Sequence, residues 1–173
     1  MALRPGRTIR KVKRPYTRVS KKVPRKSYVV GVPFPKTHQF EMGKKAEYDI
    51  TILMISKRRG QIRDQSLESA RIVAVNFLEK NLGTEFFFKI LVYPHQVIRE
   101  KPIAMGAGAD RYSQGMARSY GKPVGTAAVV NVDQPIMSMK VNKKNFDIGW
   151  QALKRASLKL SVPVHIEEAK EKI

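Results

Sequence analysis

The chain has 173 residues with 34 Lys or Arg, 14 Asp or Glu and no Cys, which gives a formal net charge of +20 and a pI near 10.4. The length and a hydrophobic content of 42% suit one folded domain with an extension. The lack of Cys excludes disulfides and thiolate metal sites and favours the cytoplasm. The charge excess indicates a polyanionic partner, for which nucleic acid is the best candidate.

Membrane partners, targeting segments and metals are disfavoured. The apolar runs at 50–55 and 90–93 are far too short to span a bilayer, and prolines interrupt the basic N-terminal region where an amphipathic helix would be needed. The N-terminus has no apolar stretch of the kind found in secretory signals, so it is interpreted as mature sequence. His38, His95 and His165 are too dispersed to suggest zinc ligands, and no cofactor is expected.

The first 45 residues are predicted to form an extended basic arm that binds nucleic acid. The first forty residues hold twelve Lys or Arg and no Asp or Glu, and X-Pro steps favour extended backbone. The aromatic residues that can anchor such an arm on its partner are Tyr16, Tyr28, Phe34 and Phe40. The candidate RNA-binding cations of the arm are Arg4, Arg7, Arg10, Lys11, Lys13, Arg14, Arg18, Lys21, Lys22, Arg25, Lys26, Lys36, Lys44 and Lys45.

Residues 46–173 are predicted to fold as a single α+β domain. A β-rich run at 47–55 predicts a strand that ends in a charged turn at 57–60. Apolar residues at helical spacing then predict an amphipathic helix over 64–82. Asp64 or Ser66 is available as its N-cap, and Gly83 as its C-terminal stop.

Further strands follow this helix. The run at 85–93 predicts a second strand, and 95–100 continues it as an edge segment or turn. Two β-rich runs at 126–132 and 136–141 predict an antiparallel hairpin, because only residues 133–135 separate them.

A second helix is predicted to begin after Asn145 and to run to about residue 160, with a last strand at 163–166. The expected architecture is an α/β sandwich in which two helices pack on a mostly antiparallel sheet.

Residues 101–125 form a connection too long for a compact domain unless it has a function. It holds five of the eleven glycines, which permit close backbone approach to phosphate. Cations and aromatic rings complete a composition that suits a flexible nucleic-acid probe. These residues are Arg111, Arg118, Lys122, Tyr112 and Tyr120.

Nucleotide-binding motifs are not supported in this loop. Five residues rather than four separate Gly115 from Gly121, and Pro123 stands where a P-loop needs Ser or Thr. Gly106-Ala-Gly108 lacks the third glycine of a dinucleotide fingerprint.

Several motifs in a fixed order carry a resemblance to a known family. They are Gly31-Val-Pro-x-Pro-Lys36, Gly43-Lys-Lys45, His95-x-Val-Ile-Arg99, Ala107-Gly-Ala-Asp-Arg111, Gln114-Gly-Met116, Gly121-Lys-Pro-x-Gly-Thr126, Ile136-Met-Ser138 and Ala152-Leu-Lys-Arg-Ala156. The chain resembles, nearly end to end, the ribosomal family of bacterial large-subunit protein sixteen and its archaeal and eukaryotic ten-e counterpart. It departs from eukaryotic relatives at Val129, Asp133 and Lys140, where they tend to have Arg, Gly and Arg.

The resemblance implies a structural protein of the cytoplasmic ribosome, embedded in large-subunit rRNA among neighbouring ribosomal proteins. It also implies that the loop reaches toward the peptidyl transferase centre and helps to organise the A-site tRNA region. Further RNA-binding candidates are Arg58 and Arg59 of the charged turn and, by this resemblance, Arg99 and Lys101. The candidates near tRNA are Met105, Gly106, Gly108, Asp110, Arg111, Tyr112, Gln114, Gly115, Met116, Arg118 and Lys122.

Two alternatives have weaker support. A DNA-compacting architectural protein would need duplex-spanning symmetry or a minor-groove wedge, and the sequence requires neither. An RNA-modifying enzyme could use Asp110 or His95, but no nucleophile, metal set or cofactor motif accompanies them. Asp110 beside Arg111 fits a local salt bridge or Asx-turn better. The chain is therefore predicted to position RNA rather than to catalyse a reaction.

Overall fold

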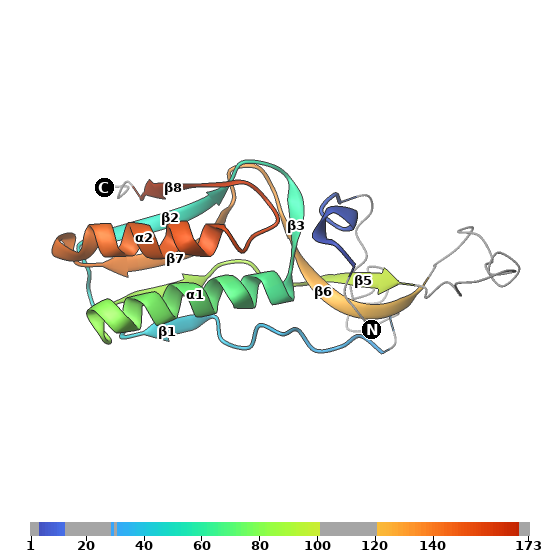
Figure 1. Cartoon of the computed structure of the whole chain (residues 1–173), viewed down its shortest axis with the longest axis horizontal. Helices are drawn as coiled ribbons and strands as arrows, with labels where there is room; N and C mark the ends of the chain where they lie inside the picture. The colour runs from blue at the N-terminus through green and yellow to red at the C-terminus, as the bar shows by residue number, and fades with distance from the viewer. Residues whose placement is uncertain (1–3, 13–28, 30, 101–120, 170–173) are drawn as a thin grey trace, which may run out of the picture.

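The computed structural model of the chain describes residues 4–12, 29, 31–100 and 121–169 (Figure 1). Within these ranges the chain forms two α-helices and two antiparallel sheets. The predicted α+β class is therefore confirmed. Most of the glycine-rich loop, residues 101–120, lies outside the described ranges.

The larger sheet has five strands, and all of its neighbouring strands run antiparallel. In spatial order they are β1 (Glu41–Gly43), β4 (Phe87–Ile90), β7 (Pro135–Val141), β2 (Ile50–Ser56) and β8 (Val164–Glu168). Buried and half-buried residues alternate along β4 and most of β2, as expected for strands with one face on the core. The strands predicted at 47–55, 85–93 and 163–166 are confirmed with shifted ends.

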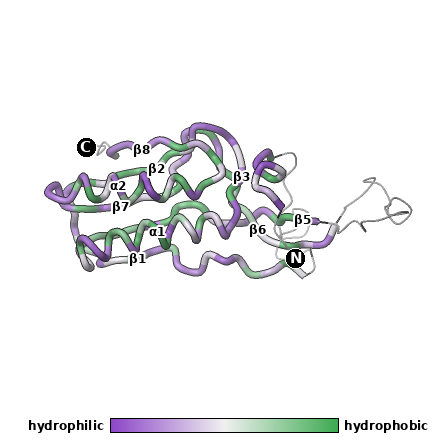
Figure 2. The backbone as a smooth tube through the Cα atoms, viewed as in Figure 1, coloured by the Kyte–Doolittle hydropathy of each residue, from purple (hydrophilic) through white to green (hydrophobic). Residues whose placement is uncertain are grey.

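Both helices cover the same face of the larger sheet and lie in front of it in Figure 1. α1 (Asp64–Leu82) and α2 (Phe146–Ser157) share one hydrophobic core with the strands, and Figure 2 shows hydrophobic stretches, in green, in both helices and in the strands behind them. Gly149 lets α2 approach the sheet closely, because a Cβ there would stand 3.1 Å from Ile52 Cδ1. The core is therefore a layer of large side chains between two helices and five strands.

The smaller sheet has β3 (Gly60–Arg63), β6 (Lys122–Val130) and β5 (Gln96–Glu100) in that order. It extends beyond the helices to one end of the molecule, on the right in Figure 1. β5 is an edge strand, so the edge segment predicted at 95–100 is confirmed. β6 is buried from Thr126 to Ala128 and more exposed toward Lys122, so its outer half lies beyond the core.

The predicted hairpin of 126–132 and 136–141 was wrong. These runs form β6 and β7, but β6 pairs with β3 and β5, whereas β7 pairs with β2 and β4. The connection is held by β2 instead: the Asp133 N–H donates to Ser56 O at 2.9 Å, and the Ser56 N–H donates to Gln134 O at 3.0 Å. Asp133 has a φ of 57°, and at this reversal the chain crosses from one sheet to the other.

The ends of α1 were only partly predicted. The helix spans the predicted residues and stops at Gly83, whose φ of 60° lies in the left-handed region that glycine adopts easily. Its N-cap is Arg63, without a side-chain cap bond, so the prediction of Asp64 or Ser66 was wrong. Asp64 is instead the first residue of the helix, and its carboxylate accepts from the Gln65 N–H within the first turn and from Lys36 and Thr126 outside the helix.

Some short elements were missed or shifted. β1, β3 and the 3₁₀ helix η1 (Gly6–Thr8) were not predicted, and each has only three or four residues, too few to reveal a period. A second 3₁₀ helix, η3 (Lys143–Asn145), precedes α2. α2 starts after Asn145 as predicted but ends at Ser157 rather than near residue 160.

Candidate nucleic-acid interface

The first described segment, residues 4–12, lies along the edge of β3. The Gln61 main-chain N–H donates to Arg10 O at 3.1 Å, and Gln61 Nε2 donates to Ile9 O. Gly60 permits this approach, because a Cβ there would stand 3.2 Å from Arg10 O. The segment thus covers a sheet edge whose N–H and C=O groups would otherwise stay open.

Arg4 joins this segment to the tip of the smaller sheet. Its main-chain O accepts a hydrogen bond from the Arg63 guanidinium, and its Nε lies 3.7 Å from Glu100 Oε2. The Glu100 side chain is only 16% exposed, whereas that of Arg4 is 51% exposed, so the base faces solvent more than the acid does. The exposed cations of the segment are Arg4, Arg7, Arg10 and Lys11.

A buried carboxylate fixes the chain around Lys36 beside the start of α1. Asp64 is 5% exposed, and its Oδ2 accepts from the Lys36 N–H at 2.9 Å and from the Thr126 hydroxyl at 3.2 Å. Its Oδ1 accepts from the Gln65 N–H at 2.8 Å, and the Thr37 hydroxyl donates to Asp64 O at 2.9 Å. The Lys36 residue itself is exposed, so this network presents a cation while keeping the acid inside.

The two ends of the glycine-rich loop start from neighbouring positions. Glu100 at the end of β5 pairs with Lys122 at the start of β6. Gly121 has a φ of 91°, and a Cβ there would lie 3.0 Å from Glu100 C, so the close pairing requires glycine. Residues 4–12, 33–37, 99–100 and 121–122 together form the loop-end surface, at the right of Figure 1.

This surface brings together several of the predicted RNA-binding residues from four separate segments of the chain. They are Arg4, Arg7, Arg10, Lys11, Lys36, Arg99 and Lys122. Lys44, Lys45, Arg58 and Arg59 are described but lie elsewhere, and the other predicted residues fall outside the described ranges. Those of the arm are Lys13, Arg14, Arg18, Lys21, Lys22, Arg25 and Lys26, and those of the loop are Lys101, Met105, Gly106, Gly108, Asp110, Arg111, Tyr112, Gln114, Gly115, Met116 and Arg118.

Lys45 forms a salt bridge with Glu41, the first residue of β1, and is not part of the loop-end surface. Its Nζ lies 2.6 Å from Glu41 Oε2, and Lys89 Nζ lies 2.7 Å from Glu41 Oε1. Hydrogen bonds from Lys45 and then from Lys89 lower the pKa of Glu41 from 4.5 to about 2. The charge of this pair of lysines is therefore partly neutralised at neutral pH.

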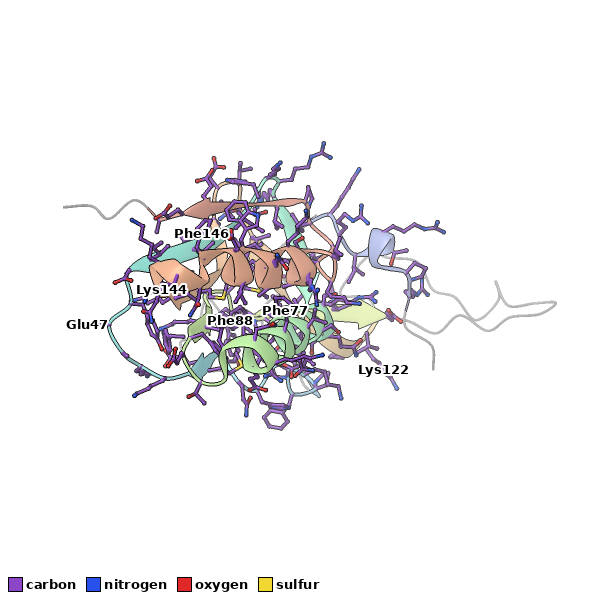
Figure 3. All side chains as sticks on the ribbon, turned by 60° about the vertical axis from the view of Figure 1, so that its left-hand side comes forward. Glu47, Phe77, Phe88, Lys122, Lys144 and Phe146 are labelled. Carbon is purple, nitrogen blue, oxygen red and sulfur yellow. The ribbon has the colours of Figure 1, made fainter. Side chains whose placement is uncertain are left out.

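Lys44 lies at the same end of the molecule as Lys45. The Tyr48 hydroxyl donates to Lys44 O at 2.9 Å, and burial, followed by the charge of Glu85, raises the pKa of Tyr48. Figure 3 shows Glu47 of this end on the far side of the molecule from Lys122. The structure thus separates these lysines from the loop-end surface.

Arg58 and Arg59 are exposed in the turn between β2 and β3. The Ser56 hydroxyl donates to Arg58 O at 2.7 Å and shapes this turn. The two arginines lie between the two sheets along the chain, and Arg59 directly precedes Gly60, the residue that Arg10 approaches.

Three side chains that organise the loop-end surface were not predicted in that role: Gln61, Arg63 and Asp64. Gln61 and Arg63 bind the main chain of residues more than fifty positions earlier, and Asp64 binds that of Lys36. No local pattern in the sequence encodes such pairings. Phe40, predicted as an anchor for the partner, instead stacks on Tyr93 with ring centroids 5.4 Å apart.

Within residues 4–12, 29, 31–100 and 121–169, no three His, Asp or Glu gather as metal ligands would. No helix in these ranges is both long and apolar enough to cross a membrane.

Two of the histidines contact neighbouring side chains. The centroids of the His95 and Tyr93 rings lie 4.6 Å apart, and His165 Nε2 lies 2.9 Å from Glu167 Oε1.

Sequence comparison decides the family. The family described as ribosomal protein L16p/L10e matches residues 12–167 of the 173. The chain belongs to the L16p/L10e family. The resemblance seen in its motifs is therefore confirmed.

Archaeal relatives support the same assignment. Proteins named large ribosomal subunit protein uL16 from Methanocella arvoryzae and Sulfolobus acidocaldarius are 43% and 42% identical, and each match covers 96% of this chain and 94% of the relative. The relative from Archaeoglobus fulgidus is 39% identical over 96% of this chain and 92% of its own length. This L16p/L10e protein is thus a structural, non-enzymatic component of the large subunit of the cytoplasmic ribosome, associated with rRNA and other ribosomal proteins.

Proposed function

We propose that this L16p/L10e protein binds large-subunit rRNA through its basic arm and loop-end surface. The proposal extends to the glycine-rich loop, which would help to organise the A-site tRNA region near the peptidyl transferase centre. The observation that supports it best is the attachment of residues 4–12 to the edge of β3 by Gln61. This attachment presents exposed cations at the end of the molecule where β5 ends and β6 begins.

The charge distribution of the loop-end surface favours a phosphate backbone as partner. Its acids are turned inward, because Asp64 is buried in hydrogen bonds and Glu100 is paired with Arg4. Its cations other than the half-buried Arg99 remain exposed on several segments. Phosphate neutralisation and counterion release would supply affinity, and RNA shape, backbone contacts and unpaired bases would supply specificity.

The phosphate contacts are tested by neutralising three cations together, Arg7→Gln, Arg10→Gln and Lys11→Gln. We expect the slope of log affinity for protein-free large-subunit rRNA against log salt to become shallower by about 2 to 3, since each lost phosphate contact removes about 0.7–0.9. The matched control neutralises three exposed lysines in and around α2, away from the loop-end surface: Lys144, Lys154 and Lys159. A slope that stays unchanged in the first variant would contradict the role of the loop-end surface.

The same assay separates RNA from DNA as the partner. Duplex DNA of equal length to a large-subunit rRNA fragment is added as competitor at constant salt. An rRNA-binding protein that reads shape and unpaired bases should keep its rRNA when the DNA is in excess. Equal competition by DNA would favour an architectural DNA-binding protein instead.

The tRNA role is tested by replacing residues 101–120 with a short Gly-Ser linker. Glu100 of β5 and Lys122 of β6 are paired residues on neighbouring strands, so a short linker can close this connection without disturbing the smaller sheet. We expect the variant to enter large subunits but to lower the occupancy of A-site tRNA on the assembled ribosomes. Normal A-site occupancy with the linker would exclude the loop from this role. Failure to enter the large subunit would instead assign the loop to assembly or rRNA binding.

A further inference from the structure

Phe34 is the most exposed large hydrophobic side chain in the described ranges, at 82%. It stands between Pro33 and Pro35, which hold the backbone on both sides and restrict Phe34 to extended conformations. Because the backbone of this segment is already stiff, it has less conformational entropy to lose on binding. An exposed ring in such a segment is therefore well prepared to receive a partner.

The Phe34 ring borders a groove between the 33–36 segment and the smaller sheet. The apolar side of this groove comes from Ile98, Val124 and Gly125. Ile98 pairs with Gly125 and Arg99 with Pro123, so a bulge leaves Val124 as the extra residue, and it is 44% exposed. A Cβ added at Gly125 would meet nothing within 4 Å, so the space above this glycine is open.

The polar side of the groove carries cations and hydrogen-bond donors. Lys36, Arg63 and Gln65 line it, together with the carboxylates of Asp64 and Glu100. Both carboxylates have partners: Asp64 accepts from main-chain N–H groups and a hydroxyl, and Glu100 pairs with Arg4. An apolar side chain of a protein would gain nothing from the cations, whereas a nucleotide uses both sides of the groove.

We propose that this groove binds one unpaired nucleobase of rRNA, stacked on Phe34, with the adjoining phosphate on Lys36 or Arg63. The inference rests on the proposed rRNA binding and names a subsite within it. A paired base in an A-form helix offers no free face, so the ligand is a base in a loop, bulge or end. The recognition is stacking, which tolerates any base, since every base has a π-face.

The test compares full-length wild-type protein with Phe34→Leu and Phe34→Tyr by filter binding to protein-free large-subunit rRNA. Leu keeps an apolar side chain but lacks the flat ring, whereas Tyr keeps the ring. We expect Phe34→Leu to weaken binding by about 5- to 150-fold and Phe34→Tyr to bind like wild type. The salt slope should not change, because no cation is removed.

A second variant blocks the groove without touching Phe34. Gly125→Val places a β-branched side chain in the open space of a strand, and it should weaken rRNA binding as Phe34→Leu does. Thermal unfolding of each variant checks that the fold is intact, and the high exposure of Phe34 means that Phe34→Leu should not destabilise it.

The outcomes distinguish the subsite from the general function. Equal rRNA affinity of wild type and Phe34→Leu would overturn the base subsite and leave rRNA binding standing. No binding of rRNA by wild type would overturn the proposed function itself. If Phe34→Leu kept normal rRNA affinity but was lost from sedimenting large subunits, the groove would belong to a neighbouring protein and the base subsite would be wrong.

Discussion

The two sheets of this L16p/L10e protein are held in place by different kinds of contact. The larger sheet and its helices bury large side chains such as Phe86, Phe88 and Leu153 almost completely. The smaller sheet adds Ile62, Ala128 and Val130 to the same core, but toward the loop it also buries Ala127 and Thr126, and it is joined to the N-terminal segment by hydrogen bonds. The first half therefore gains stability from apolar burial, whereas the second gains a defined arrangement of cations from polar contacts.

The largest effect is expected from Phe88→Ala in the packed half. Phe88 is fully buried between the helices and the sheet, and Figure 3 shows it within the helix-covered layer. Truncation should lower the free energy of unfolding by about 3–5 kcal/mol through lost burial and a residual cavity. Urea unfolding followed by circular dichroism measures this change.

The matched control is its neighbour on the opposite face of β4. Phe87 is half-buried and Lys45 Nζ lies 6.0 Å from its ring centroid, so Phe87→Ala should cost clearly less. Equal losses at the two positions would contradict the assignment of the core to the helix-covered face.

The next effect in size is expected from Asp64→Ala at the junction with the loop-end surface. The change leaves the Thr126 hydroxyl and the N–H groups of Lys36 and Gln65 without their acceptor, at a cost of roughly 1–3 kcal/mol. Amide exchange at Lys36 should accelerate, while exchange in β7 should change only with global stability. Asp64→Asn keeps one acceptor oxygen and should fall between wild type and Asp64→Ala. An unchanged Lys36 exchange rate would show that Asp64 does not hold this segment.

The packed half was the more predictable from sequence. The helical spacing of apolar residues over 64–82 and the β-rich run at 47–55 identified α1 and β2, because periodicity reports which face of an element is buried. The partner of a strand is not encoded locally. β6 and β7 both carried a strand pattern, but β6 pairs with β3 and β5, β7 pairs with β2 and β4, and the intervening turn is hydrogen-bonded to Ser56.

The loop-end surface was predictable as a set of charges but not as a geometry. The basic composition and the family motifs pointed to Arg4, Lys36 and Lys122. Their convergence depends on contacts from Gln61 and Arg63 to the main chain of the N-terminal segment, and these join residues more than fifty positions apart. Polar contacts of this kind leave no period in the sequence, so they become visible only in the folded chain.

A smaller effect is expected where the two helices of the packed half meet. The Arg155 guanidinium carbon lies 3.9 Å from the centroid of the Phe77 ring and links α2 to α1. A double-mutant cycle with Arg155→Met and Phe77→Leu should give a coupling free energy of about 0.5–1 kcal/mol, as for an exposed cation–π pair. Met keeps an apolar stem, so the cycle isolates the charge. A coupling of zero within error would mean that the helices meet through apolar contact alone.

The smallest effect is expected for the pH dependence of stability that comes from Glu41, the first residue of β1. Here the packed half also uses charge. Lys45 and then Lys89 lower the pKa of Glu41 from 4.5 to about 2. Because the folded pKa is the lower one, the stabilisation by Glu41 is fully present above pH 4.5 and is lost as the pH falls toward 2. The difference in urea midpoint between wild type and Glu41→Gln should therefore be constant above pH 4.5 and vanish near pH 2. Since Glu41 is solvent-accessible, high salt should shrink this difference at neutral pH. A difference that persisted unchanged at pH 2 would mean that Glu41 acts through packing, and the packed half would then be stabilised by burial even at its polar edge.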